Sequence, residues 1–202
     1  MRKLVTAIAL VTAGAGVYLR LLRRPVLDWG ATATEAARRM PGDDLLPDAG
    51  LVATRAITVN APAAAIWPWL VQMGSGRGGA YTYDWIENLL GLDMHSADRI
   101  HPEWQTLEVG QVLRNGDGPG MRIEILEPER VLSSRSEDGS WVWTFELVEE
   151  AGATRLVSRN RIATGGSLVM ERKMLRGIKQ RAERLAAGPR PAARDSEARL
   201  AV

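Results

Sequence analysis

The chain has 202 residues, of which 46% are hydrophobic and 25% charged, a composition typical of globular domains that excludes wholesale disorder. The absence of cysteine excludes a disulfide scaffold, a thiol nucleophile and any Cys-ligated zinc or iron–sulfur site. The net charge of +2 is uneven: residues 25–166 hold twelve Arg and Lys against twenty Asp and Glu, while basic residues dominate both ends. Because a nucleic-acid binder concentrates positive charge on its folded body, we expect no nucleic-acid partner.

Residues 1–24 are predicted to form a single-pass N-terminal membrane anchor. Residues 4–19 are uncharged, and a helix over 4–22 would be about 28 Å long, near the hydrocarbon thickness of a bilayer. A cleaved signal peptide, with Ala13-Gly14-Ala15 as its cleavage site, and a helix packed on the domain are the alternatives. The anchor predicts a membrane localisation with lipid as a partner. The side of the membrane stays open, because positive charges flank the segment at both ends.

Two further segments are predicted to lie outside the folded domain. Residues 25–52 are rich in Pro, Gly and Asp, and only 34–40 could form a short helix, so we predict a linker. Residues 188–202 follow a Gly-Pro pair and are predicted to form a disordered tail.

The remaining segment, residues 53–187, is predicted to be one α+β domain. A strand at 54–60 precedes short helices at 61–71 and 83–90, and an amphipathic helix at 167–187 ends the domain. Between them, turn residues and alternating polarity predict five strands, at 111–114, 121–126, 130–136, 141–148 and 154–162. A curved antiparallel sheet of this kind needs a helix across its concave side, which would leave a cavity between helix and sheet.

The order of elements and several local sequences resemble the SRPBCC superfamily, also called START/polyketide cyclase-like, in an uncharacterised bacterial branch. The resemblance covers 53–187 and is carried by residues 53–59, 61–70, 72–84 and 170–179. It implies the helix-grip fold: six to seven antiparallel strands around the long C-terminal helix, with two short helices after the first strand. Since this superfamily includes lipid carriers, hormone receptors, cyclases and stress proteins, the resemblance does not choose an activity.

Several side chains are candidates to line the cavity. In the glycine-rich loop 74–79, an arginine could bind a carboxylate or phosphate of a ligand, or it could be an ordinary ion-paired residue in a tight turn. An aromatic face at 141–147 could contact the ligand or be plain core, and two polar residues on the neighbouring strand need partners if buried. The ligand-binding candidates are Arg77, Tyr81, Tyr83, Trp141, Trp143, Phe145, Ser158, Asn160, Met170 and Met174.

Asp84, Glu87 and His95 are the candidates for acid–base catalysis. A carboxyl group in apolar surroundings has a raised pKa and can exchange a proton near neutral pH. The alternatives are a helix cap for Asp84, a solvated Glu87 and an ordinary loop hydrogen bond for His95. No metal-ligand spacing or cofactor motif is present, and we expect neither group.

Three functions remain open. The first is membrane-tethered binding of a lipid-like or polyketide-like hydrophobic molecule. The second is a cyclase or dehydratase that uses acid–base residues in the same cavity. The third is an interaction scaffold without a ligand, which a cavity below about 300 Å³ would favour. The sequence determines neither the ligand nor the oligomeric state.

Overall fold

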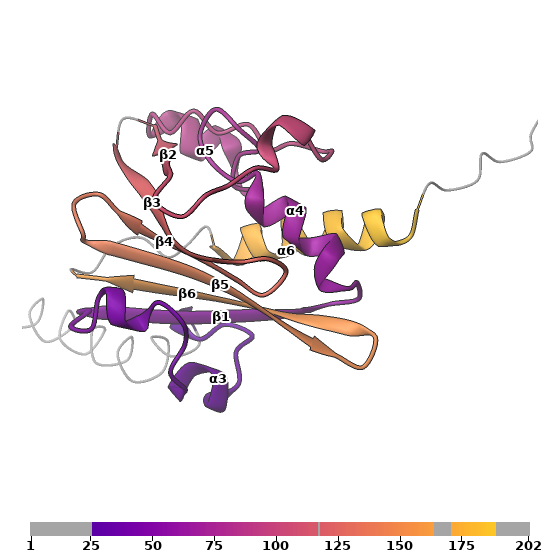
Figure 1. Ribbon diagram of the computed structural model, residues 1–202, viewed down its shortest axis with the longest axis horizontal. Helices are drawn as coiled ribbons and strands as arrows, with labels where there is room; N and C mark the ends of the chain where they lie inside the picture. Colours follow the sequence, from indigo (N-terminus) through magenta and orange to yellow (C-terminus); the bar gives the residue numbers. More distant parts are fainter. Residues whose placement is uncertain (1–25, 117, 164–170, 189–202) are drawn as a thin grey trace, which may run out of the picture.

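The structure is a computed structural model that describes residues 26–116, 118–163 and 171–188 (Figure 1). Its centre is one antiparallel sheet with the strand order β1-β6-β5-β4-β3-β2. The strands are β1 (Leu51–Val59), β2 (Val112–Asn115), β3 (Gly118–Glu127), β4 (Val131–Ser136), β5 (Trp141–Glu150) and β6 (Ala153–Ile162). The described residues thus contain six strands, at the lower end of the predicted number.

One face of this sheet is covered by α4 (Ala63–Val71) and the C-terminal helix α6 (Glu171–Ala186), which pack on each other (Figure 1). The predicted stripe of α6 is buried: Met174, Leu175, Ile178 and Ala182 are at most 1% exposed and join one core with apolar residues of α4 and the sheet. This is the helix-grip arrangement that the resemblance implies. The predicted helix began at 167, but residues 167–170 lie outside the described residues.

A glycine lets α6 approach the rest of the core closely. A Cβ added at Gly177 would lie 2.5 Å from the backbone oxygen of Tyr81 and 2.9 Å from its Cβ. Any larger residue would therefore push the helix away from the loop that carries Tyr81.

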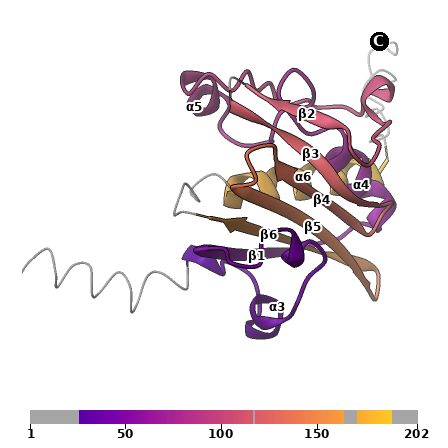
Figure 2. The ribbon, with the colours of Figure 1, turned by 60° about the vertical axis from the view of Figure 1, so that its left-hand side comes forward.

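The short helix α5 (Asp84–Leu89) and the loop after it, with a 3₁₀ turn at Pro102–Trp104, lie beside β2 and β3. Figure 2 shows them at the end of the sheet opposite to α3 (Ala33–Ala37). The sheet is therefore extended by irregular chain at its β2 edge.

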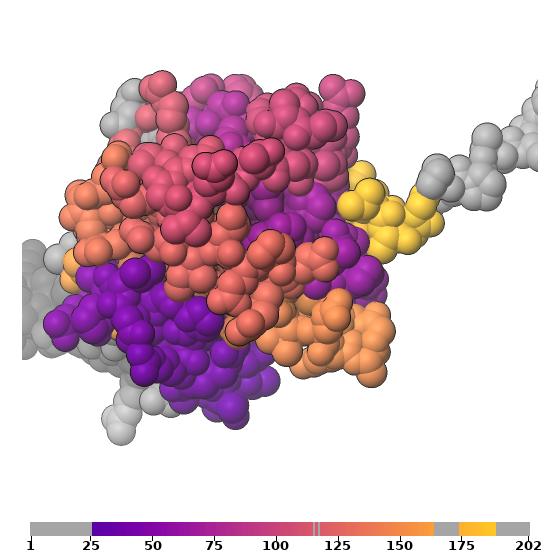
Figure 3. Space-filling model, in the orientation of Figure 1, coloured from indigo at the N-terminus to yellow at the C-terminus, as the bar shows by residue number. Residues whose placement is uncertain are grey.

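Residues 26–50, predicted to be a linker, pack against the sheet face opposite α6. Figure 3 shows this indigo segment spread over that side of the molecule. Every second residue of β6 points to this face, and three of them are arginines. Arg155 forms an ion pair with Glu35 at 2.7 Å, and Arg159 forms one with Asp43 at 2.8 Å. Arg161 donates to the backbone oxygens of Leu46 and Pro47, both at 2.8 Å.

Arg159 makes the most contacts in this layer. Its side chain is 3% exposed, and besides Asp43 its guanidinium donates to Thr54 Oγ1 and to three backbone oxygens, at 2.7–3.1 Å. A buried guanidinium needs such partners, because each unmatched donor would cost desolvation energy. The segment before β1 therefore completes the folded unit.

The predicted transmembrane helix requires a correction of both the fold class and the localisation. Along 26–116, 118–163 and 171–188, no helix is both long and apolar enough to cross a bilayer. The segment predicted to be the anchor, residues 1–24, lies outside the described residues. Over the described residues the fold class is therefore an α+β helix-grip domain, and the membrane assignment is withdrawn.

Candidate functional site: an aromatic pocket at the β2 end of the sheet

Three aromatic side chains form a continuous stack along β5. The ring centroids of Trp141 and Trp143 are 5.3 Å apart with planes at 20°, and those of Trp143 and Phe145 are 4.9 Å apart at 44°. The alternation of the strand places them on one face, as predicted. Phe145 is buried, whereas both indoles are partly exposed, so the stack runs from the core to the surface. We call these three residues the aromatic ladder.

The two indoles of the ladder are held by the neighbouring strand. Trp143 Nε1 donates to Ser158 Oγ at 2.9 Å, and Trp141 Nε1 donates to Asn160 Oδ1 at 2.5 Å. Each bond is diagonal across β5 and β6, where Trp143 lies opposite Asn160. The sequence predicted that Ser158 and Asn160 would need partners, with a ligand as one possibility. The structure gives both of them an indole N–H, which fixes the ring planes.

The ladder forms one wall of a pocket, which we call the aromatic pocket. Strands β2, β3, β4 and β5 form one side, and the end of α4, the loop after it and Met94 form the other. The cavity measures about 70 Å³ and is lined by Leu70, Met73, Gly74, Ala80, Met94, Leu113, Arg114, Met121, Ile123, Leu132, Ser134, Trp141, Trp143 and Phe145. This is the volume of about two water molecules, far below the 300–1,000 Å³ of a typical ligand site.

The position of the aromatic pocket also differs from the predicted cavity. Between α6 and the sheet, the described residues fill the space: Met174, one of the candidates there, is 1% exposed within the core and does not line the pocket. Met170, the other candidate on this helix, lies outside the described residues. The open space lies instead toward the β2 edge, where the sheet faces α4 and irregular chain.

Three methionines of the pocket wall, Met73, Met94 and Met121, were not among the predicted ligand contacts. They come from the end of α4, the loop after α5 and β3, which are separated in sequence and meet only in the fold. The one available signal was the alternation of Met121 with Ile123 on β3, which places both on one face.

The predicted loop arginine, Arg77, turns toward the protein. Its Nη2 donates to the backbone oxygens of Val71 at 3.2 Å and Trp104 at 2.6 Å, and burial lowers its pKa. It thereby ties the C-terminal end of α4 to the 3₁₀ turn at Pro102–Trp104. It does not line the aromatic pocket.

The two predicted tyrosines also lie away from the pocket lining. Tyr81 is 1% exposed, its hydroxyl donates to the backbone oxygen of Trp69 at 3.0 Å, and burial raises its pKa. Tyr83 is 43% exposed at the start of α5. The ladder is therefore the part of the predicted ligand-binding set that the fold gathers around one cavity.

The three acid–base candidates are not brought together at the aromatic pocket. Asp84 accepts hydrogen bonds from the backbone N–H and hydroxyl of Ser96, at 2.8 and 2.6 Å. The side chain of His95 is 75% exposed, with Nε2 3.4 Å from Asp93. Glu87 is 5% exposed and burial raises its pKa. None of the three lines the pocket, and as catalytic residues they stay predictions.

Within the described ranges, no three His, Asp or Glu side chains come together in a way that could hold a metal ion. The aromatic pocket offers two polar side chains, those of Arg114 and Ser134. Its chemistry is therefore that of apolar contact and ring stacking.

A scan against family models and a search of curated proteins find no match. Among solved structures, the chain is similar to CalU16 from Micromonospora echinospora, with 16% identity, a TM-score of 0.42 and an alignment over 65% of each chain. It is also similar to an AHSA1-like protein from Aeromonas hydrophila, with 15% identity, a TM-score of 0.39 and 64% of this chain against 92% of that one. A polyketide cyclase-like protein from Corynebacterium glutamicum matches at 16% identity and a TM-score of 0.35, over 67% and 81%.

The fold that the resemblance predicted is confirmed. The confirmation rests on the strand order and the gripping C-terminal helix of this chain itself. At the identities and TM-scores above, the activities of the matched proteins say nothing about this chain.

Proposed function

We propose that the chain binds a small hydrophobic molecule with a planar, polyketide-like part, which stacks on the aromatic ladder. The observation that carries the proposal is a stack of three rings whose two indoles are partly exposed at a cavity lined by methionines. Ring stacking contributes about 0.5–1.5 kcal/mol per pair beyond the burial of apolar area. A flat ring that continues the stack therefore gains more binding free energy than a saturated chain of equal size.

The volume of the pocket restricts the ligand further. A cavity of about 70 Å³ holds only part of a molecule, so the ligand lies partly on the exposed indoles. Met73, Met94 and Met121 are unbranched and can change rotamer at low cost, which lets the cavity widen around a ring. A lipid-like ligand with a long chain fits this space less well than a planar one. Arg114 and Ser134 supply polar contacts for a carbonyl or hydroxyl at the rim.

The test is binding of the neutral probe N-phenyl-1-naphthylamine, which carries a flat naphthalene ring, to the full-length chain, followed by probe fluorescence. We expect saturable binding that weakens about tenfold in Trp143→Leu, which removes the middle ring of the ladder. Met73→Phe should also weaken it, because the added ring fills the cavity. Trp85→Leu is the matched control, since Trp85 is 70% exposed on α5 and outside the pocket. Equal affinity in all four proteins would refute the proposal.

One observation favours a second candidate, an interaction scaffold without a ligand. The cavity volume of about 70 Å³ is well below the 300 Å³ at which small-molecule sites begin, so the side chains around it leave little free space. The scaffold predicts that the probe does not bind and that native mass spectrometry of the protein from its own host detects no bound small molecule. Acid–base catalysis has less support, because the candidate residues lie outside the pocket lining.

A further inference from the structure

The short helix α5 holds an acidic side chain toward the protein and its apolar side chains toward the outside. Trp85 is 70% exposed, and Leu89 and Leu90 are 79% and 69% exposed, whereas Glu87 is 5% exposed. Trp85 and Leu89 are four residues apart, so they share one side of the helix. Figure 2 shows α5 at the periphery of the molecule, beyond β2 and β3. This is the reverse of the usual distribution on a surface helix.

Hydrogen bonds hold α5 in this orientation. Asp84 accepts from the backbone N–H and the hydroxyl of Ser96, and the side-chain amide of Asn88 exchanges two hydrogen bonds with the backbone of Met94, at 2.6 and 2.9 Å. These four bonds tie one side of the helix to the loop that follows it. The exposure of the apolar side chains is therefore a property of the folded loop.

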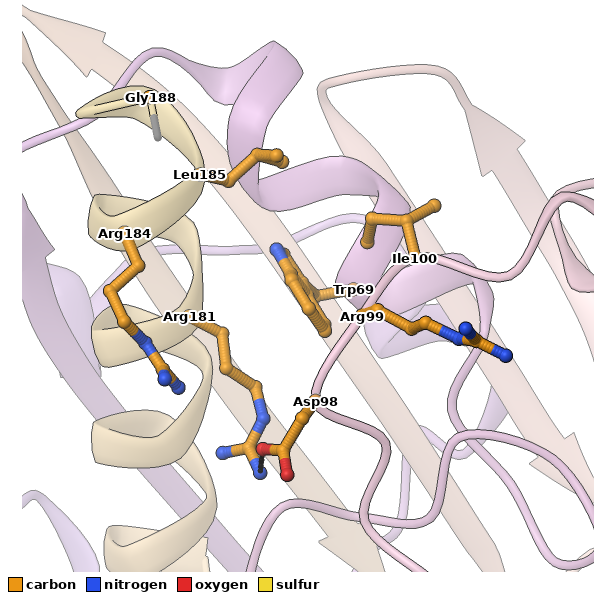
Figure 4. A pocket seen from close by; sticks show the side chains of 8 residues that line it. All are labelled: Trp69, Asp98, Arg99, Ile100, Arg181, Arg184, Leu185 and Gly188. Carbon is orange, nitrogen blue, oxygen red and sulfur yellow. Dashed lines mark hydrogen bonds and ion pairs between the residues drawn. The ribbon is translucent and has the colours of Figure 1, made fainter. Parts of the chain in front are cut away.

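The outward side of α5 is uncharged. Of the two acidic residues in the helix, one is half-buried and the other is buried. The exposed leucine of α6 has different surroundings, because Leu185 lines a hollow together with Arg99, Arg181 and Arg184 (Figure 4). A strongly charged partner would find no counter-charge on α5, whereas a second surface of the same kind would bring no like charges together.

The area of this surface is large enough to be covered by a second copy. With Tyr83, which is 43% exposed at the start of the helix, the apolar side chains of α5 offer roughly 500 Å², at the upper end of the patches that monomeric proteins expose. Two copies that cover each other would bury roughly 1,000 Å² in total, the smallest area expected of a specific interface. A two-fold axis permits this contact, because each copy presents the same face to the other.

We propose that two copies of this chain associate through α5 as a two-fold symmetric dimer. Trp85 and Leu89 of each copy lie at the centre of the contact, with Tyr83 and Leu90 around them, and Trp85 is the aromatic anchor. Since the buried area is at the lower limit, we expect a dissociation constant on the order of 10–100 µM. The proposal does not depend on the ligand of the aromatic pocket, because no residue of α5 lines that pocket.

The test is sedimentation equilibrium of the full-length chain at concentrations below and above this dissociation constant. Trp85→Ser with Leu89→Ser should weaken self-association at least tenfold. Val148→Ser with Leu185→Ser is the matched control, because it removes two exposed apolar side chains from β5 and α6, and it should leave the dissociation constant unchanged. Residues 1–25 are the same in all three proteins, so association through that segment would not respond to the substitutions in α5.

Cross-linking locates the contact, since the chain has no cysteine of its own. A bismaleimide should link two copies of Leu90→Cys, in proportion to the dimer fraction, and should not link Leu185→Cys. A chain that stays monomeric at every concentration would overturn the proposal and leave α5 to a different molecule or to another segment of the chain. Equal effects of the two double variants, or equal cross-linking at positions 90 and 185, would also overturn it.

Discussion

Replacing Arg159 by methionine tests whether the segment before β1 is part of the folded unit. Methionine keeps the apolar stem of the side chain and removes the guanidinium, which makes five hydrogen bonds at 2.7–3.1 Å. Of its two arginine partners, Asp43 would then keep only Arg161, at 3.4 Å, and three backbone oxygens would lose a charged donor. Breaking a buried pair of this kind costs about 3–5 kcal/mol.

The assay is urea unfolding of the full-length chain, with hydrogen exchange as the local measurement. A loss of about 3–5 kcal/mol is a large part of the 5–15 kcal/mol that stabilise a typical domain. With a slope of about 2 kcal/mol per M, the midpoint should fall by about 2 M. Amides of residues 33–45 should lose protection before those of the sheet. Arg130→Met is the control, because its pair with Glu127 is exposed and should contribute less than about 1 kcal/mol.

A cost below about 1 kcal/mol for Arg159→Met, with unchanged protection of residues 33–45, would refute the reasoning. It would mean that apolar contacts around Met40 and Val157 hold the segment without the arginine.

Two further predictions concern the same framework. The hydrogen bond from Arg155 lowers the pKa of Glu35 to about 2. The ionised Glu35 therefore contributes about 2 kcal/mol to the free energy of unfolding after solvent screening. This contribution is present above pH 4.5, the usual pKa of the group, and is lost as the pH falls toward 2. Glu35→Gln should flatten this part of the acid-unfolding curve, and an unchanged curve would count against the pair. Gly177→Ala should destabilise by about 1–3 kcal/mol in thermal unfolding, because the Cβ of the alanine would meet the backbone of Tyr81. Gln180→Ala on the exposed side of the helix should be nearly neutral, and equal effects of the two substitutions would contradict the close approach.

The elements that were predictable are those with a long, regular period. Alternation over 141–148 and 154–162 predicted β5 and β6, and three- and four-residue spacing predicted α6. Both patterns arise because the two sides of each element have different surroundings, so the residue type changes with the period of the element.

The segment before β1 was not predictable in this way. Arg155, Arg159 and Arg161 alternate with Leu156 and Ser158, a pattern that usually marks a strand with one solvent face. Their partners lie more than 100 residues earlier in the chain, and composition alone does not identify them. Three arginines among the four alternate positions 155, 157, 159 and 161 were the available sign that this face has acidic or carbonyl partners.

The aromatic pocket was predictable only in part. The ladder could be read from one strand, but the methionines opposite it come from three separate segments. For Ser158 and Asn160 the sequence suggested a ligand as a partner, and it did not identify the indole N–H groups that lie diagonally across the sheet. That contact depends on the register of β5 and β6, which the turn between them sets and which the pattern of one strand does not give.

Strand β6 holds a different layer of the molecule on each of its faces. Arg159 points to the segment before β1, whereas Ser158 points to the ladder. The pocket lining comes from β2, β3, β4, β5, the chain around α4 and the loop after α5, not from the N-terminal layer. Loss of Arg159 should therefore lower the stability of the chain while the affinity for N-phenyl-1-naphthylamine stays unchanged under native conditions. A parallel loss of affinity would show that the N-terminal layer controls the register of β6, because a one-residue shift would turn Ser158 and Asn160 away from both indoles.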